Sequence, residues 1–361
     1  MNNDNELRKI GIIPKGKIEV TDKIKIAKYV SDKLSDNVEA LSSSYNYNEL
    51  YIRIYNCEMY YADIDPKFKG VFYYYKYNSI YIDKNATDIE RYLIHEILHY
   101  LQKFNKVGKE TDRAGLCNFM EFKILGLWIN EAIVQYITAK AMGNKIKRIE
   151  NQFVSIATNS ENYYKYLTSL ANQILFLLGE EQAIQSTVSS NEKFEDDLYN
   201  TFQDDTNKIL KGFDAILDEN NKQDRDEAKI INIYMETQEL IYKTYFKNMS
   251  KMITEKEDVN DQVQKLENYE TIMGKLRNPE YQLQSANYGL QDAKNINEFI
   301  TNEDFEKFRQ IMRDEFFLRY LDIEKRKEQT ALSVINRNKI YELFRKIREF
   351  IQRKLGQLGG N

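Results

Sequence analysis

The sequence predicts an α+β protein, in which a small N-terminal mixed sheet precedes a large, mainly α-helical region. Runs of β-branched and aromatic residues, which are typical of strands, fall within residues 49–83. Further along the chain, no proline occurs between Pro66 and Pro279, and glycine is sparse. A long stretch with so few helix-breaking residues is typical of consecutive helices.

The N-terminal part is expected to begin with a helix over residues 21–41, because apolar side chains recur there with the periodicity of a helix. Three short runs that follow are rich in strand-forming residues and are expected to build the sheet: 49–55, 70–75 and 79–83. Residues 76–78 are expected to join the last two runs as a hairpin.

Two further helices are expected after the sheet. Thr87, with Glu90 three residues later, predicts a capping box at the start of a helix over residues 88–104. A polar loop separates this helix from a second one over residues 118–142, which Gly143-Asn144 is expected to end as a C-cap.

The first of these helices carries a candidate metal site. His95, Glu96 and His99 form an H-E-x-x-H motif, and the chain has no other histidine. Positions i and i+4 share one face of a helix, so both imidazoles can bind one divalent metal ion, most often zinc. Glu96 can then take a proton from a metal-bound water. An ordinary amphipathic helix with two histidines is the alternative interpretation.

Two histidines leave a zinc ion without the third protein ligand that zinc sites usually have. The second helix offers Glu131, a carboxylate among apolar residues such as Leu127, Ile133 and Ile137. Burial of an unpaired carboxylate is costly, and a metal ion would neutralise the charge. Glu131 is therefore the candidate third ligand.

The run Trp128–Ala132 (WINEA), downstream of the H-E-x-x-H motif, resembles the gluzincin metallopeptidases, which include the thermolysin-like and aminopeptidase N-like enzymes. The resemblance covers residues 70–143. It implies a zincin fold with Glu96 as the general base. It also implies one zinc ion per chain, held by three ligands: His95, His99 and Glu131.

The resemblance has further implications for the surroundings of the metal. It implies an edge strand just before the metal helix, expected at residues 79–83, that binds an extended peptide substrate. Gln135 stands where thermolysin-like members have an aspartate that supports a histidine ligand, and an amide oxygen can also accept an imidazole N–H. The Gly-x-Met-x-Asn motif of the aminopeptidases is absent, which favours an endopeptidase.

Hydrolysis also needs a donor for the oxyanion, and the chain has no third histidine to supply one. Tyr163, Tyr164 and Tyr166 follow Glu131 on the side where aminopeptidase N-like members place a tyrosine. Tyr163 and Tyr164 are therefore the candidate catalytic tyrosines, and a packing or surface role is the alternative for each.

The predicted domain organisation has three parts: a zincin-like catalytic sheet-and-helix unit over 1–143, a helical subdomain over 144–220 that completes it, and a helical bundle or coiled-coil-like domain over 221–361. Breaks between helices are expected near residues 158–160, 186–191 and 218–224. The last helix, over about 338–355, has a basic face that can contact an acidic membrane surface or a partner. A solvated face of a bundle helix is the alternative.

Composition narrows the remaining choices. The formal net charge of −4 does not favour a nucleic-acid partner, and no apolar run is long enough for a transmembrane segment. No signal peptide is visible, so the compartment stays open between the cytoplasm and export. Cys57 and Cys117 are expected to be separate thiols.

Taken with the motif, these observations predict a zinc-dependent peptidase, and an endopeptidase in particular, that acts on a peptide or protein substrate. The alternative is a catalytically inactive gluzincin-fold protein that binds partners through its helical region.

Overall fold

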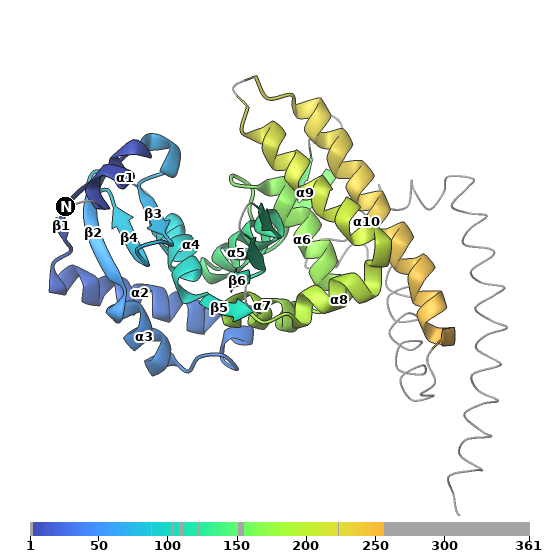
Figure 1. The fold of residues 1–361 in the computed structure, drawn as a ribbon, viewed down its shortest axis with the longest axis horizontal. Helices are drawn as coiled ribbons and strands as arrows, with labels where there is room; N and C mark the ends of the chain where they lie inside the picture. The colour runs from blue at the N-terminus through green and yellow to red at the C-terminus, as the bar shows by residue number, and fades with distance from the viewer. Residues whose placement is uncertain are drawn as a thin grey trace, which may run out of the picture. The chain divides into compact units, whose positions relative to one another are not determined.

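A computed structural model of the chain describes residues 3–255, apart from residues 88, 103, 108–110, 121–122, 151–154 and 223. The described residues up to Tyr245 belong to one compact unit. This unit is α+β, as predicted, with a small N-terminal sheet followed by a mainly helical part (Figure 1).

The N-terminal sheet has four strands in the order β1-β2-β4-β3. Their bounds are Ile12–Lys17 for β1, Glu58–Ile64 for β2, Val71–Tyr74 for β3 and Ser79–Ile82 for β4. β2 and β4 are parallel and the other two pairs are antiparallel, so the sheet is mixed, as predicted. β3 and β4 form the predicted hairpin.

The edge strand is β3, and the prediction that residues 79–83 form the edge is wrong. β4 lies between β2 and β3, and all four of its residues are buried. The reason is β2, a strand that the sequence analysis did not identify, which pairs with the side of β4 that was expected to be open.

The prediction of a strand at residues 49–55 is also wrong, because these residues lie in helix α3, Tyr47–Asn56. A complete capping box begins this helix: the Asn46 side chain accepts a hydrogen bond from the Glu49 N–H, and the Glu49 carboxylate accepts one from the Asn46 N–H. This cap outweighs the strand propensity of the aromatic and β-branched residues that follow.

The other N-terminal helices are α1, Asn3–Lys9, and α2, Val20–Asn37, which confirms the helix predicted there. The motif helix is α4, Glu90–Leu101, and it packs against β3 and α5. Its N-cap is Ile89 and no side chain caps it, so the capping box predicted at Thr87 is wrong.

The described residues between Phe104 and Leu125 lie mostly in strands rather than in the predicted loop and helix start. An antiparallel sheet contains β5, Phe104–Val107, β6, Thr111–Ala114, β7, Cys117–Met120, and β8, Lys123–Leu125. Gly126 then leads the chain into α5, Leu127–Ala141. Only glycine suits this position, because its φ is 75° and a Cβ there would lie 2.3 Å from the Leu116 carbonyl oxygen. The predicted C-cap is confirmed: the Gly143 N–H and Asn144 N–H donate to Lys140 and Ala139 carbonyls in a Schellman motif.

After a two-stranded sheet of β9, Lys147–Glu150, and β10, Ser155–Thr158, the chain is helical. The helices are α6, Lys165–Leu178, α7, Glu180–Ser189, α8, Lys193–Phe202, α9, Thr206–Asn220, and α10, Glu227–Glu255. Three 3₁₀ turns complete the described elements: Glu39–Leu41, Pro66–Phe68 and Gln203–Asp205. The predicted breaks near 158–160 and 218–224 overlap the starts of the observed gaps before α6 and α10, but α7 continues to Ser189 through most of the break predicted at 186–191. The breaks at Gly179 and at Gln203–Asp205 were not predicted.

The described part of the chain contains no helix that is both long and apolar enough to cross a membrane. Cys57 and Cys117 are buried free thiols, as predicted. The domain limits stay predictions, and the basic helix predicted over 338–355 lies outside the described residues.

Candidate metal centre

The H-E-x-x-H motif lies in a cleft of about 420 Å³ that is bordered by the edge strand β3 and by helices α4 and α5. His95, Glu96 and His99 enter this cleft from α4, and Glu131 enters it from α5. Within the part of the chain that the structure describes, His95, His99 and Glu131 are the one group of three potential ligands that could hold a metal ion.

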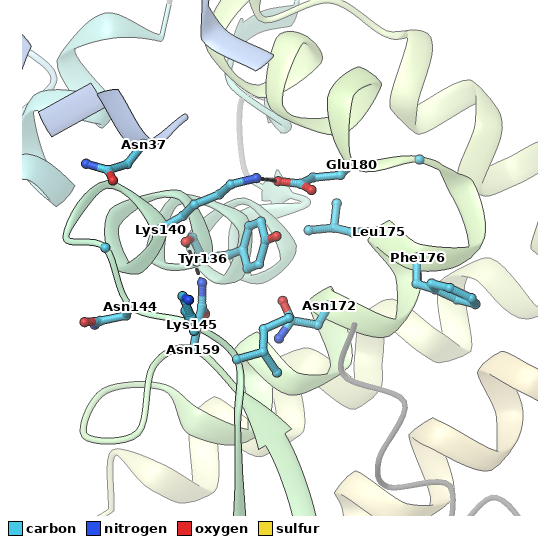
Figure 2. Close-up of a pocket in the computed structure, with 13 residues that line it drawn as sticks. Asn37, Tyr136, Lys140, Asn144, Lys145, Asn159, Asn172, Leu175, Phe176 and Glu180 are labelled. Atoms are coloured by element: carbon cyan, nitrogen blue, oxygen red, sulfur yellow. Dashed lines mark hydrogen bonds and ion pairs between the residues drawn. The ribbon is translucent and has the colours of Figure 1, made fainter. Parts of the chain in front are cut away.

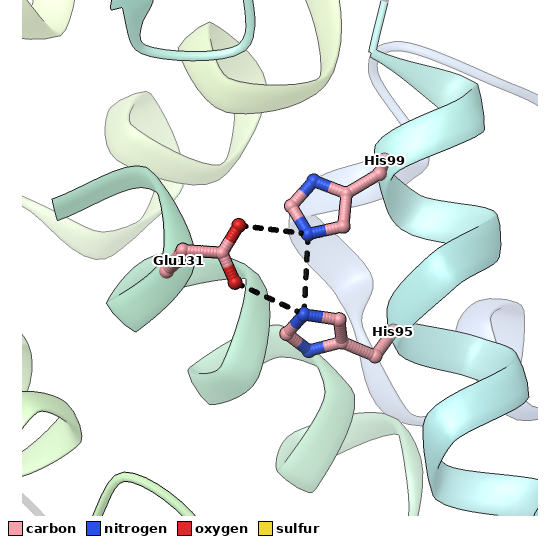
Figure 3. A group of neighbouring side chains, drawn as sticks. All are labelled: His95, His99 and Glu131. Atoms are coloured by element: carbon pink, nitrogen blue, oxygen red, sulfur yellow. Dashed lines mark hydrogen bonds and ion pairs between the residues drawn. The ribbon is translucent and has the colours of Figure 1, made fainter. Parts of the chain in front are cut away.

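The three side chains point to a common centre (Figure 3). The Nε2 atoms of His95 and His99 are 3.1 Å apart. One oxygen of the Glu131 carboxylate lies 3.3 Å from the His95 Nε2, and the other lies 3.2 Å from the His99 Nε2. The helical spacing of the histidines and the packing of α5 against α4 together produce this convergence.

The electrostatics of the cluster favour a positive charge beside the Glu131 carboxylate. Burial alone would raise the pKa of Glu131, but the two imidazoles outweigh burial and hold that pKa below its usual range. Burial likewise opposes protonation of His99, yet Glu131 raises the pKa of that imidazole to about 9. A proton or a metal cation between the two Nε2 atoms and the Glu131 carboxylate would neutralise the carboxylate charge.

A chain of hydrogen bonds orients His95 from behind. Its Nδ1 lies 3.0 Å from Gln135 Oε1, and because an amide oxygen only accepts, Nδ1 carries the proton. The Nε2 lone pair is therefore left for a metal ion. Gln135 is fixed in turn by donating to Ser160 Oγ at 2.8 Å, and Ser160 donates to the carbonyl of Tyr163. This geometry confirms the predicted contact between Gln135 and an imidazole.

A second amide chain, which the sequence analysis missed, orients His99. Its Nδ1 lies 3.2 Å from Gln102 Oε1, and Gln102 donates to Asn130 Oδ1 at 2.8 Å. Asn130 also accepts from the Leu116 N–H at 3.0 Å. Gly115 makes room for this pair, since a Cβ at that position would lie 2.2 Å from Asn130 Oδ1. The available signal was the spacing of three between His99, in the last turn of α4, and the C-cap residue Gln102.

Glu96 is tied to the edge strand. It accepts a hydrogen bond of 2.9 Å from the Tyr73 N–H. The bond from the Asp83 N–H to the Gly70 carbonyl sets the alternation of the β3–β4 ladder, so the main-chain groups of Tyr73 point away from β4. Burial raises the pKa of Glu96, which makes its carboxylate a stronger base.

Two of the three candidate tyrosines lie at the cleft. The Tyr163 ring meets the His95 ring edge-on, with centroids 6.1 Å apart, and it packs on Tyr164 at 4.1 Å. Burial raises the pKa of Tyr164 to about 12 and raises that of Tyr163 as well, so both hydroxyls stay protonated and able to donate. Tyr166 instead donates to Glu227 at 2.6 Å and packs on Tyr234, which is the packing alternative.

A larger cavity of about 660 Å³ lies beside the C-terminal half of α5 (Figure 2). Glu180 is the one carboxylate among its lining residues, and it is already paired with Lys140. Asn159 donates to the carbonyl of Tyr136 at 3.0 Å. The set of metal-binding groups therefore distinguishes the smaller cleft as the candidate site.

No family model, curated protein or solved structure matches this chain. The resemblance to the gluzincins therefore stays an expectation from the motif residues.

Proposed function

We propose that this protein is a zinc-dependent peptidase of gluzincin type, acting as an endopeptidase on a peptide or protein substrate. The observation that carries the proposal is the convergence of the two Nε2 atoms and the Glu131 carboxylate, with separations of 3.1–3.3 Å. A catalytic zinc site needs three such ligands and an open fourth position.

The separations between ligand atoms favour zinc over larger ions. A tetrahedral ion with bonds of about 2.0–2.1 Å has ligand atoms about 3.3–3.4 Å apart. The observed distances are within about 0.3 Å of this range. Calcium and magnesium take oxygen ligands, so the two imidazoles also favour a transition metal or zinc.

His95, His99 and Glu131 would hold the ion. When bound, zinc supplies a Lewis acid that polarises the substrate carbonyl and lowers the pKa of a water molecule. Glu96 takes a proton from the attacking water and later delivers it to the nitrogen of the leaving amine. Its hydrogen bond from the Tyr73 N–H holds one carboxylate oxygen, and the other is left for this transfer.

The cleft also offers hydrogen-bonding groups for the oxyanion and for the main chain of the substrate. Tyr163 and Tyr164 line it and can donate from their hydroxyls to the oxyanion of the tetrahedral intermediate. The Tyr73 carbonyl faces the open edge of β3, where it can accept a hydrogen bond from the main chain of an extended peptide.

The test is the Glu96→Gln variant, with Glu90→Gln as a matched control. Both substitutions remove one carboxylate from α4, but Glu90 is exposed in the first turn. We expect Glu96→Gln to bind one equivalent of zinc and to lose at least about a thousandfold in cleavage of a peptide library. Glu90→Gln should match the unmodified protein in both measurements.

Persistent cleavage by Glu96→Gln would refute the assignment of the base. Purified protein with less than about half an equivalent of zinc would favour the alternative, a gluzincin-fold module that binds partners without hydrolysing them.

A further inference from the structure

The metal cleft continues into a second groove of about 820 Å³. Tyr73, Tyr75 and Gln102 line both spaces, so the groove begins where β3 and α4 end. Its opposite wall comes from α3 and the turn before it, including Tyr45 and Arg53. A peptide that follows the edge strand through the cleft would therefore reach this groove.

Arg53 is a half-buried cation in the wall of this groove. Its guanidinium lies over the Tyr45 ring, 5.4 Å from the centroid, and no carboxylate among the described residues forms an ion pair with it. Glu49, one turn earlier on α3, also lines the groove, but its carboxylate accepts a hydrogen bond from the Asn46 N–H at 3.0 Å and forms no ion pair with Arg53. Tyr100 donates to the main-chain carbonyl of Arg53 at 3.2 Å, which ties this position to the motif helix.

The other end of the edge strand also carries a cation. Lys67 and Lys69 line the cleft just before β3, and Lys67 lies 3.5 Å from Asp65. Lys69 is exposed and forms no ion pair with any described carboxylate. The chain as a whole is acidic, with a formal net charge of −4. Both ends of β3 therefore lie near positively charged side chains, in a protein whose net charge is negative.

We propose that the groove binds an acidic side chain of the substrate, and that Arg53 is the residue that selects it. This inference rests on the proposed peptidase function. A guanidinium can form two parallel hydrogen bonds with a carboxylate, and stacking on Tyr45 holds its plane in place before the substrate arrives. Because Arg53 is half-buried, such a pair is screened less than a fully exposed one.

The experiment compares peptides that carry glutamate or glutamine at each position around the cleaved bond. The two residues have nearly the same shape, so the ratio of their kcat/KM values reports the charge alone. We expect the unmodified protein to favour glutamate by about tenfold at one position on the groove side. In Arg53→Met this ratio should fall to about one at that position, and Arg53→Lys should restore part of it.

Lys69→Met is the matched control, because it removes a cation from the other end of the strand. It should leave the ratio at the groove position within about twofold of its original value. An equal loss in Lys69→Met would overturn the assignment to Arg53, since the effect would then be a general one of charge. Zinc content and the melting temperature of each variant check that the fold is intact.

The outcomes separate the two proposals. If peptides are cleaved with no preference for glutamate, the Arg53 inference is wrong and the peptidase function stands. If no peptide is cleaved by zinc-loaded protein, both are wrong.

Discussion

Replacing Gln135 by leucine tests whether the amide behind His95 controls metal binding. In the structure Gln135 Oε1 accepts from His95 Nδ1 at 3.0 Å, and both side chains are buried. Leucine keeps the apolar volume but cannot accept a hydrogen bond. The substitution therefore removes this contact together with the hydrogen bond that Gln135 donates to Ser160 Oγ.

The penalty falls on the metal-bound state. Without a metal, the His95 imidazole can move its proton to Nε2, toward Glu131, and so avoid an unpaired Nδ1–H. With zinc on Nε2 the proton must stay on Nδ1, where the variant offers no acceptor. A buried unpaired donor costs about 1–3 kcal/mol, so we expect zinc to bind about 10–100 times more weakly.

The assay is competition for zinc with a chelating dye at neutral pH. Gln135→Glu, which keeps an acceptor, should bind zinc at least as tightly as the unmodified protein. Gln173→Leu is the matched control, because Gln173 is also a buried glutamine. Its amide donates a hydrogen bond of 3.1 Å to the hydroxyl of Tyr234 on α10. Unchanged zinc affinity in Gln135→Leu, or equal weakening in Gln173→Leu, would refute the reasoning.

Three further substitutions test stability: two at glycines and one at a buried amide. Gly115→Ala should lower the free energy of unfolding by about 2–4 kcal/mol in urea denaturation, since its φ is 60° and its Cβ would crowd Asn130. Gly143→Ala, with a φ of 77° but open space around it, should cost only about 1 kcal/mol, and equal losses would contradict the crowding argument. Asn172 is buried, and neither of its amide atoms has a hydrogen-bond partner among the described residues, so Asn172→Leu should raise the unfolding free energy by about 1–2 kcal/mol. A loss of stability there would mean that the cavity in Figure 2 holds a partner for the amide.

The metal ligands could be found from the sequence because the signals are local. His95 and His99 are one helical turn apart, and Glu131 stands out as a charge among apolar residues. The strands β5–β8 were not predicted, because residues 104–125 show no clear alternation of apolar and polar residues. Their strand form depends on pairing with one another.

The order of strands in the sheet shows a different limit. The hairpin of β3 and β4 follows from two strand-forming runs and a short turn. Which of the two is the edge depends on β2, a partner that joins β4 from elsewhere in the chain. The periodicity of a sequence can indicate which residues form strands, but it does not indicate which strands pair with each other.

The chemistry of the two amide chains depends on charge as well as on shape. Gln135 and Gln102 each present an amide oxygen to an Nδ1, and Gln135 stands where the thermolysin-like enzymes have an aspartate. With a divalent ion, the charges of Glu131 and Glu96 already bring the formal charge of the proposed centre to zero. Carboxylates in place of the amides would make the centre anionic and would raise the pKa of its water. Neutral amides orient both imidazoles without adding negative charge, so a bound ion would remain a stronger Lewis acid toward the substrate carbonyl.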